Sequence, residues 1–422
     1  MIGLKSYNLL LYWVAGWLII SNFQFGGLDR PSTPTQLLII LGLISYLLGT
    51  IVFPLPRKKF PKNIIDFELK KHKRKIAYFY WFSIIPLSLT FGYLTIKAIN
   101  VFVGSDTLAM RQMLLGIDGE KSVLMPSKQV HLLYELIIGS LLRVNVIIAF
   151  FMLLYYKNKL PLIISNSLLA ISSIIFLGRG FLLEFGFQIL LYVIIQREQG
   201  KRLTKRFWII FTTVIGAVLV IGATIGALRG DTEDSNLIRF LKYQIVNYHT
   251  VGFVILDQEI NDHFSRLNTN ITIGRSTLGG LERIGVLTIR RFDKTVDSAP
   301  GQNTEDLARF RSVGESEGVN LKYNAFGTLF YTFLIDGRVL FLIIGFFWLG
   351  MLIKIINNKH NAGRPYYICF VYLFTHLMVQ SVYYSPIETS NFWISFILLI
   401  LIQNMPNRLN KSKFRSAEWK KV

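Results

Sequence analysis

Arginines are the residues of this chain whose type and placement could do chemistry. They recur between residues 229 and 324, and another, Arg179, stands in the apolar stretch IIFLGRGFLLEF. A guanidinium is planar and always charged, and its fork of N–H groups binds a phosphate through two hydrogen bonds. The arginines that we expect to contact a phosphate or pyrophosphate group are Arg179, Arg229, Arg275, Arg283, Arg290 and Arg291.

Arg179 is flanked by Gly178 and Gly180, which allow the backbone to turn sharply and to approach a ligand closely. An ionisable side chain at membrane depth is a functional hypothesis by default. The alternative is that Arg179 only extends to the lipid headgroups. For the arginines after residue 228, the alternative is that they are solvated or paired with neighbouring acids. The charge pattern leaves both alternatives open.

Other ionisable residues lie inside apolar runs, where an unpaired charge is costly. We interpret them mainly as ties between helices, and the sequence Asp-Gly-Arg at 336–338 as a break within a helix. These residues are Glu135, Arg143, Glu184, Asp336, Arg338 and His376. The chain has no GxxxxGK[ST], no GxGxxG after a strand and no HExxH motif, and its histidines do not pair at metal-ligand spacing. These patterns therefore give no positive sign of a metal site.

The elements that must position these residues are membrane helices. The chain has 422 residues, 52% of them hydrophobic, and its apolar residues come in runs of the length that crosses a bilayer, about 20 residues. We expect an all-α polytopic membrane protein. The ten expected spans are Tyr7–Phe25, Gln36–Leu55, Ile76–Ile96, Val130–Tyr156, Leu160–Leu177, Phe181–Ile195, Phe207–Leu228, Ala325–Ile353, Tyr366–Tyr384 and Ile387–Met405.

The net charge of +21 is explained by orientation. With the N-terminus inside, the basic stretches RKKFPKNIIDFELKKHKRK and QREQGKRLTKR fall on the cytoplasmic side, as the positive-inside rule requires. Both termini are then cytoplasmic, and nucleic acid is not an expected partner. The first apolar run lacks a small-residue cleavage site, so we interpret it as a retained helix. The single cysteine, Cys369, excludes an intrachain disulfide.

The expected organisation has four parts: helices one to seven in 1–228, a large outer loop in 229–324, helices eight to ten in 325–405 and a basic cytoplasmic tail in 406–422. Within the loop, the apolar spacing in LIRFLKYQIVNYHTVGFVILDQ predicts an amphipathic helix lying at the outer membrane surface. The stretch STLGGLERIGVLTIRRF is ambiguous between helix and strand. PGQNTEDLARFRS predicts a turn and a short capped helix, and GESEGVNLKYN a flexible approach to the eighth span.

The pattern resembles the bacterial oligosaccharide repeat-unit polymerases of the Wzy type. Three stretches carry the resemblance: SSIIFLGRGFLLEF, the basic loop with LRGD and IRFLKY, and YNAFGTLFYTFLIDGRVLFLIIGFFWLG. The resemblance implies a GT-C-like helical fold in the bacterial plasma membrane. It also implies a glycosyltransferase that polymerises repeat units linked to undecaprenyl pyrophosphate into a surface polysaccharide on the outer face. Membrane lipids, a chain-length regulator and a flippase are the implied partners, without metal or nucleotide sugar.

In such a reaction the leaving pyrophosphate develops negative charge, which fixed guanidinium groups stabilise. A general base removes the proton of the acceptor hydroxyl. His249 is our preferred base, with Asp231, Glu233, Asp257 and Glu282 as acidic alternatives. We expect substrate contacts from Arg239, Tyr248 and Asp336. The alternative functions are an O-antigen-ligase-like transferase and, in a different class, a flippase or transporter of lipid-linked oligosaccharide; the long loop favours an enzyme.

Overall fold

The described part of the chain is mostly helical. The computed structural model describes residues 5–52, 62–104, 113–114, 122–176, 180–201, 204–205, 208–209, 212–213, 216, 241–290, 292–293, 295–307, 309–323 and 327–405. Its N-terminal elements are η1 (Ser6–Asn8), α1 (Leu9–Asn22), α2 (Thr33–Val52), α3 (Lys62–Gly104), α5 (Lys128–Leu133), the π-helix η2 (Tyr134–Gly139), α6 (Ser140–Tyr156), α7 (Leu160–Ile175) and α8 (Gly180–Glu198).

The C-terminal half adds shorter elements before the last long helices. They are the π-helix η4 (Leu241–Asn247), α11 (Tyr248–Asn261), α12 (Arg266–Thr269), α13 (Gly279–Ile289), α14 (Ala299–Leu307), β1 (Arg311–Ser316), β2 (Val319–Tyr323), α15 (Leu329–Asn361), α16 (Tyr367–Gln380), η5 (Pro386–Glu388) and α17 (Ser390–Asn404). The expected helical class is confirmed.

Within the described residues, four helical segments are long and apolar enough to cross a membrane. They are Thr33–Val52, Ile65–Val101, Tyr134–Tyr156 and Leu329–Asn361. The helices α7, α16 and α17 are apolar but shorter. Helices therefore occupy the expected ranges in the described chain, whereas most of the expected span Phe207–Leu228 lies outside the described residues. A membrane protein is supported, and the number of spans remains our prediction.

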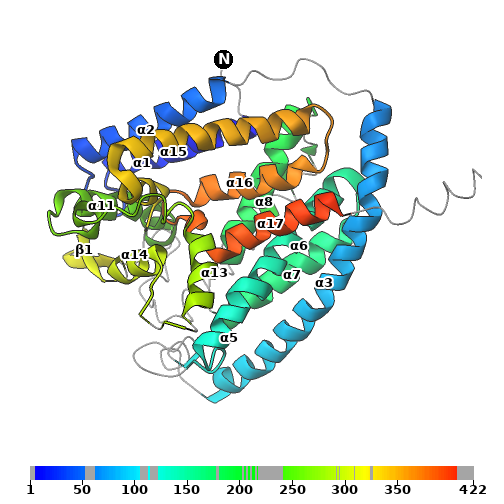
Figure 1. Cartoon of the computed structure of the whole chain (residues 1–422), viewed down its shortest axis with the longest axis horizontal. Helices are drawn as coiled ribbons and strands as arrows, with labels where there is room; N and C mark the ends of the chain where they lie inside the picture. The colour runs from blue at the N-terminus through cyan, green and yellow to red at the C-terminus, as the bar shows by residue number, and fades with distance from the viewer. Residues whose placement is uncertain are drawn as a thin grey trace, which may run out of the picture.

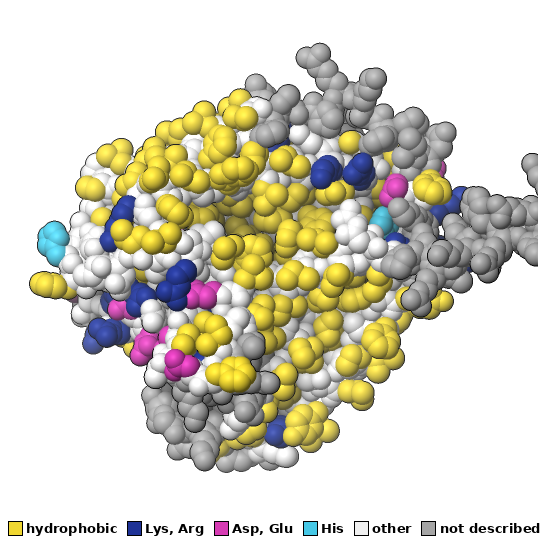
Figure 2. Space-filling view, viewed as in Figure 1, with side chains coloured by type: hydrophobic (Ala, Val, Ile, Leu, Met, Phe, Trp, Pro, Cys, Tyr) yellow, Lys and Arg dark blue, Asp and Glu magenta, His cyan; other side chains and the backbone are white. Residues whose placement is uncertain are grey.

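Apolar and charged side chains separate on the surface. Figure 1 shows α2 and α15 along the top of the molecule, α3 descending along its right side to the bottom, and α11, α14 and β1 together at the left. Figure 2 shows apolar side chains over much of this face, with many of the charged side chains near the end that holds α14 and β1. The polar elements between α8 and α15 therefore gather at one end of the apolar helices.

Glycines let α2 and α15 approach closely. A Cβ on Gly49 would lie 2.1 Å from the carbonyl oxygen of Phe347, and one on Gly350 would lie 2.2 Å from that of Tyr46. Small residues at such contacts allow helix backbones to pack against each other, which is the main source of helix association in a bilayer. The pair α2 and α15 thus forms a rigid wall of the bundle.

The expected break at 336–338 is confirmed. Gly337 (φ 177°, ψ 38°) and Arg338 (φ 58°, ψ −147°) leave helical geometry within α15. Before the break, Leu329–Asp336 is buried in the protein, whereas after it Leu340 and Trp348 are 63% and 58% exposed. The break therefore separates a helical segment that the protein covers from an apolar segment that packs on α2 with one face, where Leu342 and Phe346 are 0% exposed, and leaves another face exposed.

The expected surface helix in the loop is wrong in its placement. The residues of α11 from His249 to Leu256 are all buried, including Val251 and Phe253 at 0% exposure. Gly252 sits directly against the chain at Val382, where a Cβ would lie 2.1 Å from the carbonyl oxygen. The apolar spacing correctly indicated a helix, but both of its faces are covered by other elements, so it does not lie on a membrane.

The expected flexible approach at 314–324 is also wrong, because β1 and β2 form an antiparallel hairpin there. Glu317 (φ 54°) and Gly318 (φ 79°) both adopt left-handed backbone, which matches the two-residue turns that suit the twist of a hairpin. The ambiguous stretch after Ser276 is the helix α13, and the short helix α14 begins at Ala299, just before the expected turn.

Candidate functional site

The centre of the site is a buried carboxyl group, that of Glu388. It closes η5, the short connection between α16 and α17. Pro386 begins this turn, and the Thr389 hydroxyl caps α17 by accepting a hydrogen bond from Phe392 N at 3.4 Å. The tight connection turns Glu388 into the protein, where it is 9% exposed.

Two neutral side chains hold this carboxyl group. Asn303 Nδ2 of α14 donates to Glu388 Oε1 at 3.2 Å, and Thr332 Oγ1 of α15 donates to the same oxygen at 3.3 Å. Burial raises the pKa of Glu388 to about 7, against the hydrogen bond from Asn303 and the charge of Arg283, which lower it. Glu388 can therefore gain and lose a proton near neutral pH.

The helix α13 brings Arg283 to this carboxyl group through two glycines. A Cβ on Gly280 would lie 2.1 Å from the carbonyl oxygen of Thr389, and one on Gly279 would lie 2.2 Å from Pro300 Cγ. Only glycine allows the first turn of α13 to lie so close to η5 and α14. Arg283, one turn later, consequently acts electrostatically on Glu388.

Arg283 keeps donor capacity for an anion. Its Nη2 donates to Pro300 O at 3.2 Å and to the Thr304 hydroxyl at 3.1 Å, and its Nη1 lies 4.0 Å from Glu135 Oε1 of η2. Its Nε is buried and finds no hydrogen-bond partner among the described residues. A buried N–H without a partner costs free energy, so a bound anion at this position would supply what the protein lacks.

A second guanidinium, that of Arg143 in α6, faces the same region. The hydroxyl group of Tyr384, between α16 and η5, lies within electrostatic reach of Arg143, Glu135 and Arg283. The Nη1 atom of Arg143 is buried and has no hydrogen-bond partner in the described structure. The sequence indicated Arg143 only as a tie between helices, and its proximity to Tyr384, which Arg283 also approaches, was not foreseen.

Asp336 holds the loop that leads into α13. Its Oδ1 accepts hydrogen bonds from Ser276 N at 2.9 Å and from the Thr272 hydroxyl, and its Oδ2 accepts from Thr277 N at 2.7 Å and Thr277 Oγ1 at 2.5 Å. Asp336 is 0% exposed. Because its acceptors are saturated by this loop, the structure gives Asp336 a positioning role, not the expected substrate contact.

Asn303 connects the loop at 272–277 to Glu388 through hydrogen bonds. Its Nδ2 also donates to Ser276 Oγ at 3.0 Å, and its Oδ1 accepts from Arg266 Nε at 3.0 Å. The amide orientation is thereby fixed, with its nitrogen toward Glu388. The loop at 272–277, α14 and η5 therefore form one hydrogen-bonded unit.

The other expected arginines are engaged by acids or lie outside the described residues. Arg275 pairs with Glu282, with Nε 2.9 Å from Oε1, and Arg290 pairs with Asp297 and donates to Val296 O at 2.7 Å. Of the arginines expected to bind pyrophosphate, the described structure brings Arg283 to Glu388 and leaves Arg275 and Arg290 in ion pairs. The expected residues that lie outside the described ones are Arg179, Arg229, Arg239 and Arg291.

His249 is not placed as a base for this site. It stacks on Trp17, with 4.5 Å between ring centroids, and has Trp13, Tyr248 and Tyr383 around it. Its Nδ1 lies 2.8 Å from Ile245 O, and burial lowers its pKa to about 4. The expected sugar contact Tyr248 packs on Tyr383 at 4.8 Å between centroids. Sequence reasoning placed His249 on a basic stripe and did not foresee this aromatic enclosure.

The acidic alternatives have structural partners. Asp257 accepts hydrogen bonds from Thr35 Oγ1 at 2.6 Å and from Ser32 at the start of α2, and Glu282 is held by Arg275. Asp231 and Glu233 lie outside the described residues. Within the residues described, no cluster of three or more histidine, cysteine or acidic side chains could hold a metal ion.

Glu388 was missed because it belongs to the polar start of the tenth expected span. The stretch YYSPIETSN between two apolar runs carries a proline, an acid and capping residues, and this is the signal that could have marked it. Comparisons of the chain with models of known families, with curated proteins and with solved structures find no match.

Proposed function

We propose that this protein is a membrane glycosyltransferase that polymerises oligosaccharide repeat units carried on undecaprenyl pyrophosphate, at the outer face of a bacterial plasma membrane. The observation that carries the proposal is Glu388, a buried carboxyl group whose pKa is raised to about 7 beside Arg283. A general base works best when its pKa lies near the working pH, and here it stands next to an anion-binding group.

The charges around Glu388 suit a pyrophosphate leaving group. Arg283 and Arg143 each carry a buried N–H without a partner within the described chain. Guanidinium groups fixed in a site of low dielectric stabilise the charge that develops as the glycosidic bond breaks. In this proposal Arg283 and Arg143 bind the pyrophosphate and Glu388 Oε2 accepts the proton of the attacking sugar hydroxyl.

The position beside apolar helices supports a lipid-linked donor. Arg143 belongs to Tyr134–Tyr156, a segment long and apolar enough to cross a membrane, and Arg283 belongs to the polar elements at its end. A pyrophosphate between them would lie at the boundary between bilayer and water, where such a lipid carries its sugar. The ligase-like transferase shares this donor and differs in its acceptor.

The direct test uses purified protein in liposomes with lipid-linked repeat units and without ATP or nucleotide sugar. A ladder of glycan lengths is the expected product. Movement of labelled lipid-linked sugar across the bilayer without any ladder would contradict the polymerase and favour a flippase. Transfer onto an added acceptor lipid, but not onto a second repeat unit, would favour a ligase.

Variants of the site sharpen this test. Glu388→Gln keeps the shape but cannot accept a proton, and we expect ladder formation to fall by about 10²-fold to 10⁴-fold. Arg283→Lys keeps the charge but loses the fork, with an expected fall of about 10²-fold. The matched controls Glu305→Gln and Arg309→Lys change exposed residues outside the site and should leave the ladder unchanged.

The flippase remains the second candidate because of a polar cluster inside the bundle. Glu184 of α8 lies 2.7 Å from His376 Nε2 of α16 and accepts a hydrogen bond from the Tyr372 hydroxyl at 2.5 Å. Ionisable side chains at such depth often line a transport route or proton pathway. In a flippase, removing Glu184 would abolish lipid movement, whereas in the polymerase Glu184 acts as a tie between helices.

A further inference from the structure

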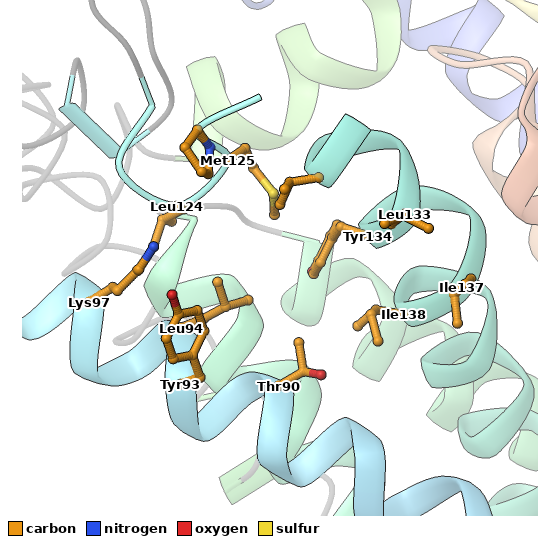
Figure 3. A pocket seen from close by; sticks show the side chains of 12 residues that line it. Thr90, Tyr93, Leu94, Lys97, Leu124, Met125, Leu133, Tyr134, Ile137 and Ile138 are labelled. Carbon is orange, nitrogen blue, oxygen red and sulfur yellow. The ribbon is translucent and has the colours of Figure 1, made fainter. Parts of the chain in front are cut away.

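A groove separates the end of α3 from α5 and η2. It holds about 360 Å³ and is lined mostly by apolar side chains. Figure 3 shows α3 on one side with Thr90 and Leu94, and η2 on the other with Tyr134 and Ile138. The lining residues recur every three or four positions on both helices, so one face of each helix is turned toward the gap. The volume is in the range of a small-ligand site.

The environment of the groove indicates hydrocarbon as its occupant. The helix α3 contains a candidate membrane span, and its residues Phe82 and Leu89 are 81% and 71% exposed. No residue of η2 is buried, although Leu136, Ile137 and Ile138 are apolar. Apolar side chains in such positions require lipid chains around them, and a gap between two such helices takes in a chain from the bilayer.

Among the described residues that line the groove, Lys97 is the cation. The ammonium of Lys97 lies 4.9 Å from the ring centroid of Tyr93, one turn before it on α3, and 3.5 Å from Val123 O. Both Lys97 and Tyr93 line the groove. A lysine stem packs along apolar surface while its charge stays at the headgroup level. A lipid chain in the groove would therefore bring its headgroup to a positive charge.

The groove faces away from the candidate site. Tyr134 and Ile138 of η2 line the groove, whereas Glu135, which lies between them in sequence, approaches Arg283 on another side of the helix. A lipid whose headgroup meets Lys97 is thus separated by η2 from a donor bound at Arg283. The two positions belong to two different lipid molecules.

We propose that this groove binds one acyl chain of an anionic phospholipid, whose headgroup meets Lys97. The bound chain supports the face of η2 that the protein leaves uncovered, and thereby holds Glu135 against Arg283. This inference concerns a lipid other than any substrate, and it stands whether or not the chain is a polymerase.

The test uses purified protein in vesicles that contain a photoreactive acyl chain in either phosphatidylglycerol or phosphatidylcholine. Labelling of peptides that contain Thr90 or Ile138 is quantified by mass spectrometry. We expect the phosphatidylglycerol probe to label about fivefold more, the preference that a lysine near an anionic headgroup provides. Lys97→Gln should remove this preference, whereas Lys322→Gln, on the exposed hairpin strand β2, should retain it.

A second pair of variants tests the groove itself. Thr90→Trp fills the gap and should abolish labelling, whereas Leu89→Trp, on the exposed side of the same helix, should not. Equal labelling by both probes would overturn the proposal, as would labelling that Thr90→Trp leaves intact. Stronger competition by undecaprenyl phosphate than by phosphatidylglycerol would also overturn it, because the groove would then belong to a lipid-linked substrate.

Discussion

The raised pKa of Glu388 predicts a pH-dependent effect on stability that one substitution removes. Burial raises the pKa of Glu388 from its ordinary value of 4.5 to about 7, so folding favours the protonated form. The corresponding stability is fully present below pH 4.5 and is lost as the pH rises through about 7. The loss between pH 5 and pH 8 amounts to about 2 to 3 kcal/mol, at about 1.36 kcal/mol for each pKa unit.

Glu388→Gln keeps the size of the side chain and cannot ionise. When the pH is raised from 5 to 8, we therefore expect the free energy of unfolding of the variant to increase by about 2 to 3 kcal/mol relative to that of the natural protein. The difference between the two proteins isolates this group, because the other titrating groups are common to both. The assay is the free energy of unfolding in mixed micelles, measured by denaturant titration at several pH values.

The neighbour Ile387 supplies the control. Ile387→Val removes one buried methylene group and should cost about 0.5 to 1.5 kcal/mol at every pH. If the difference between Glu388→Gln and the natural protein stays constant within about 1 kcal/mol from pH 5 to pH 8, the reasoning on Glu388 is refuted. Arg283 and Asn303 would then hold the carboxylate ionised, and it would be unsuited to act as a base near neutral pH.

Three further predictions concern the scaffold. Asp336→Asn places an amide opposite the backbone N–H groups of the loop at 272–277. In a denaturant titration this variant should lower the free energy of unfolding by about 2 to 3 kcal/mol. The control Asp262→Asn, at an exposed turn, should lower it far less. Gly49→Ala should lower the melting temperature, because its Cβ would lie 2.1 Å from a carbonyl oxygen of α15. The control Gly16→Ala, which has open space around it, should leave the melting temperature unchanged or raise it. Equal melting temperatures for the two variants would contradict the close packing of α2 and α15. Burial lowers the pKa of His249 to about 4, so the stability that the neutral ring contributes is fully present above about pH 6.5 and is lost as the pH falls toward 4. Relative to His249→Gln, the natural protein should lose about 2 kcal/mol in its free energy of unfolding between pH 7.5 and pH 5. A difference between the two proteins that stays constant with pH would mean that the ring is accessible to water.

Helical signals in the sequence predicted much of the fold. The apolar runs predicted helices at α2, α3, α6 and α15, because a bilayer-length run of apolar residues has few other stable forms. The break in α15 was visible in the sequence Asp-Gly-Arg, since glycine weakens helical geometry locally. The hairpin of β1 and β2 was missed because its strands have only six and five residues and β1 contains a single apolar side chain, Val313, although β2 alternates between apolar and polar residues.

The placement of α11 depended on its neighbours. Its helical spacing is evident in the sequence, but a single apolar stripe is equally compatible with a membrane surface and with a protein interior. Contacts of α11 with α1 and with the chain after α16 place it in the protein interior, where Trp17 stacks on His249. The same contacts remove His249 from the set of accessible bases.

The sequence by itself determined a helical membrane protein with an arginine-rich polar stretch, because hydropathy and charge are properties of local composition. Only the tertiary structure decided which of those charges meet. Glu388 and Asn303 are 85 residues apart, and Arg283 reaches them because Gly279 and Gly280 let α13 lie against η5 and α14. The carboxyl group becomes a proton acceptor near neutral pH through burial by these distant elements. Burial is a property of the packed chain, and no local pattern in YYSPIETSN encodes it.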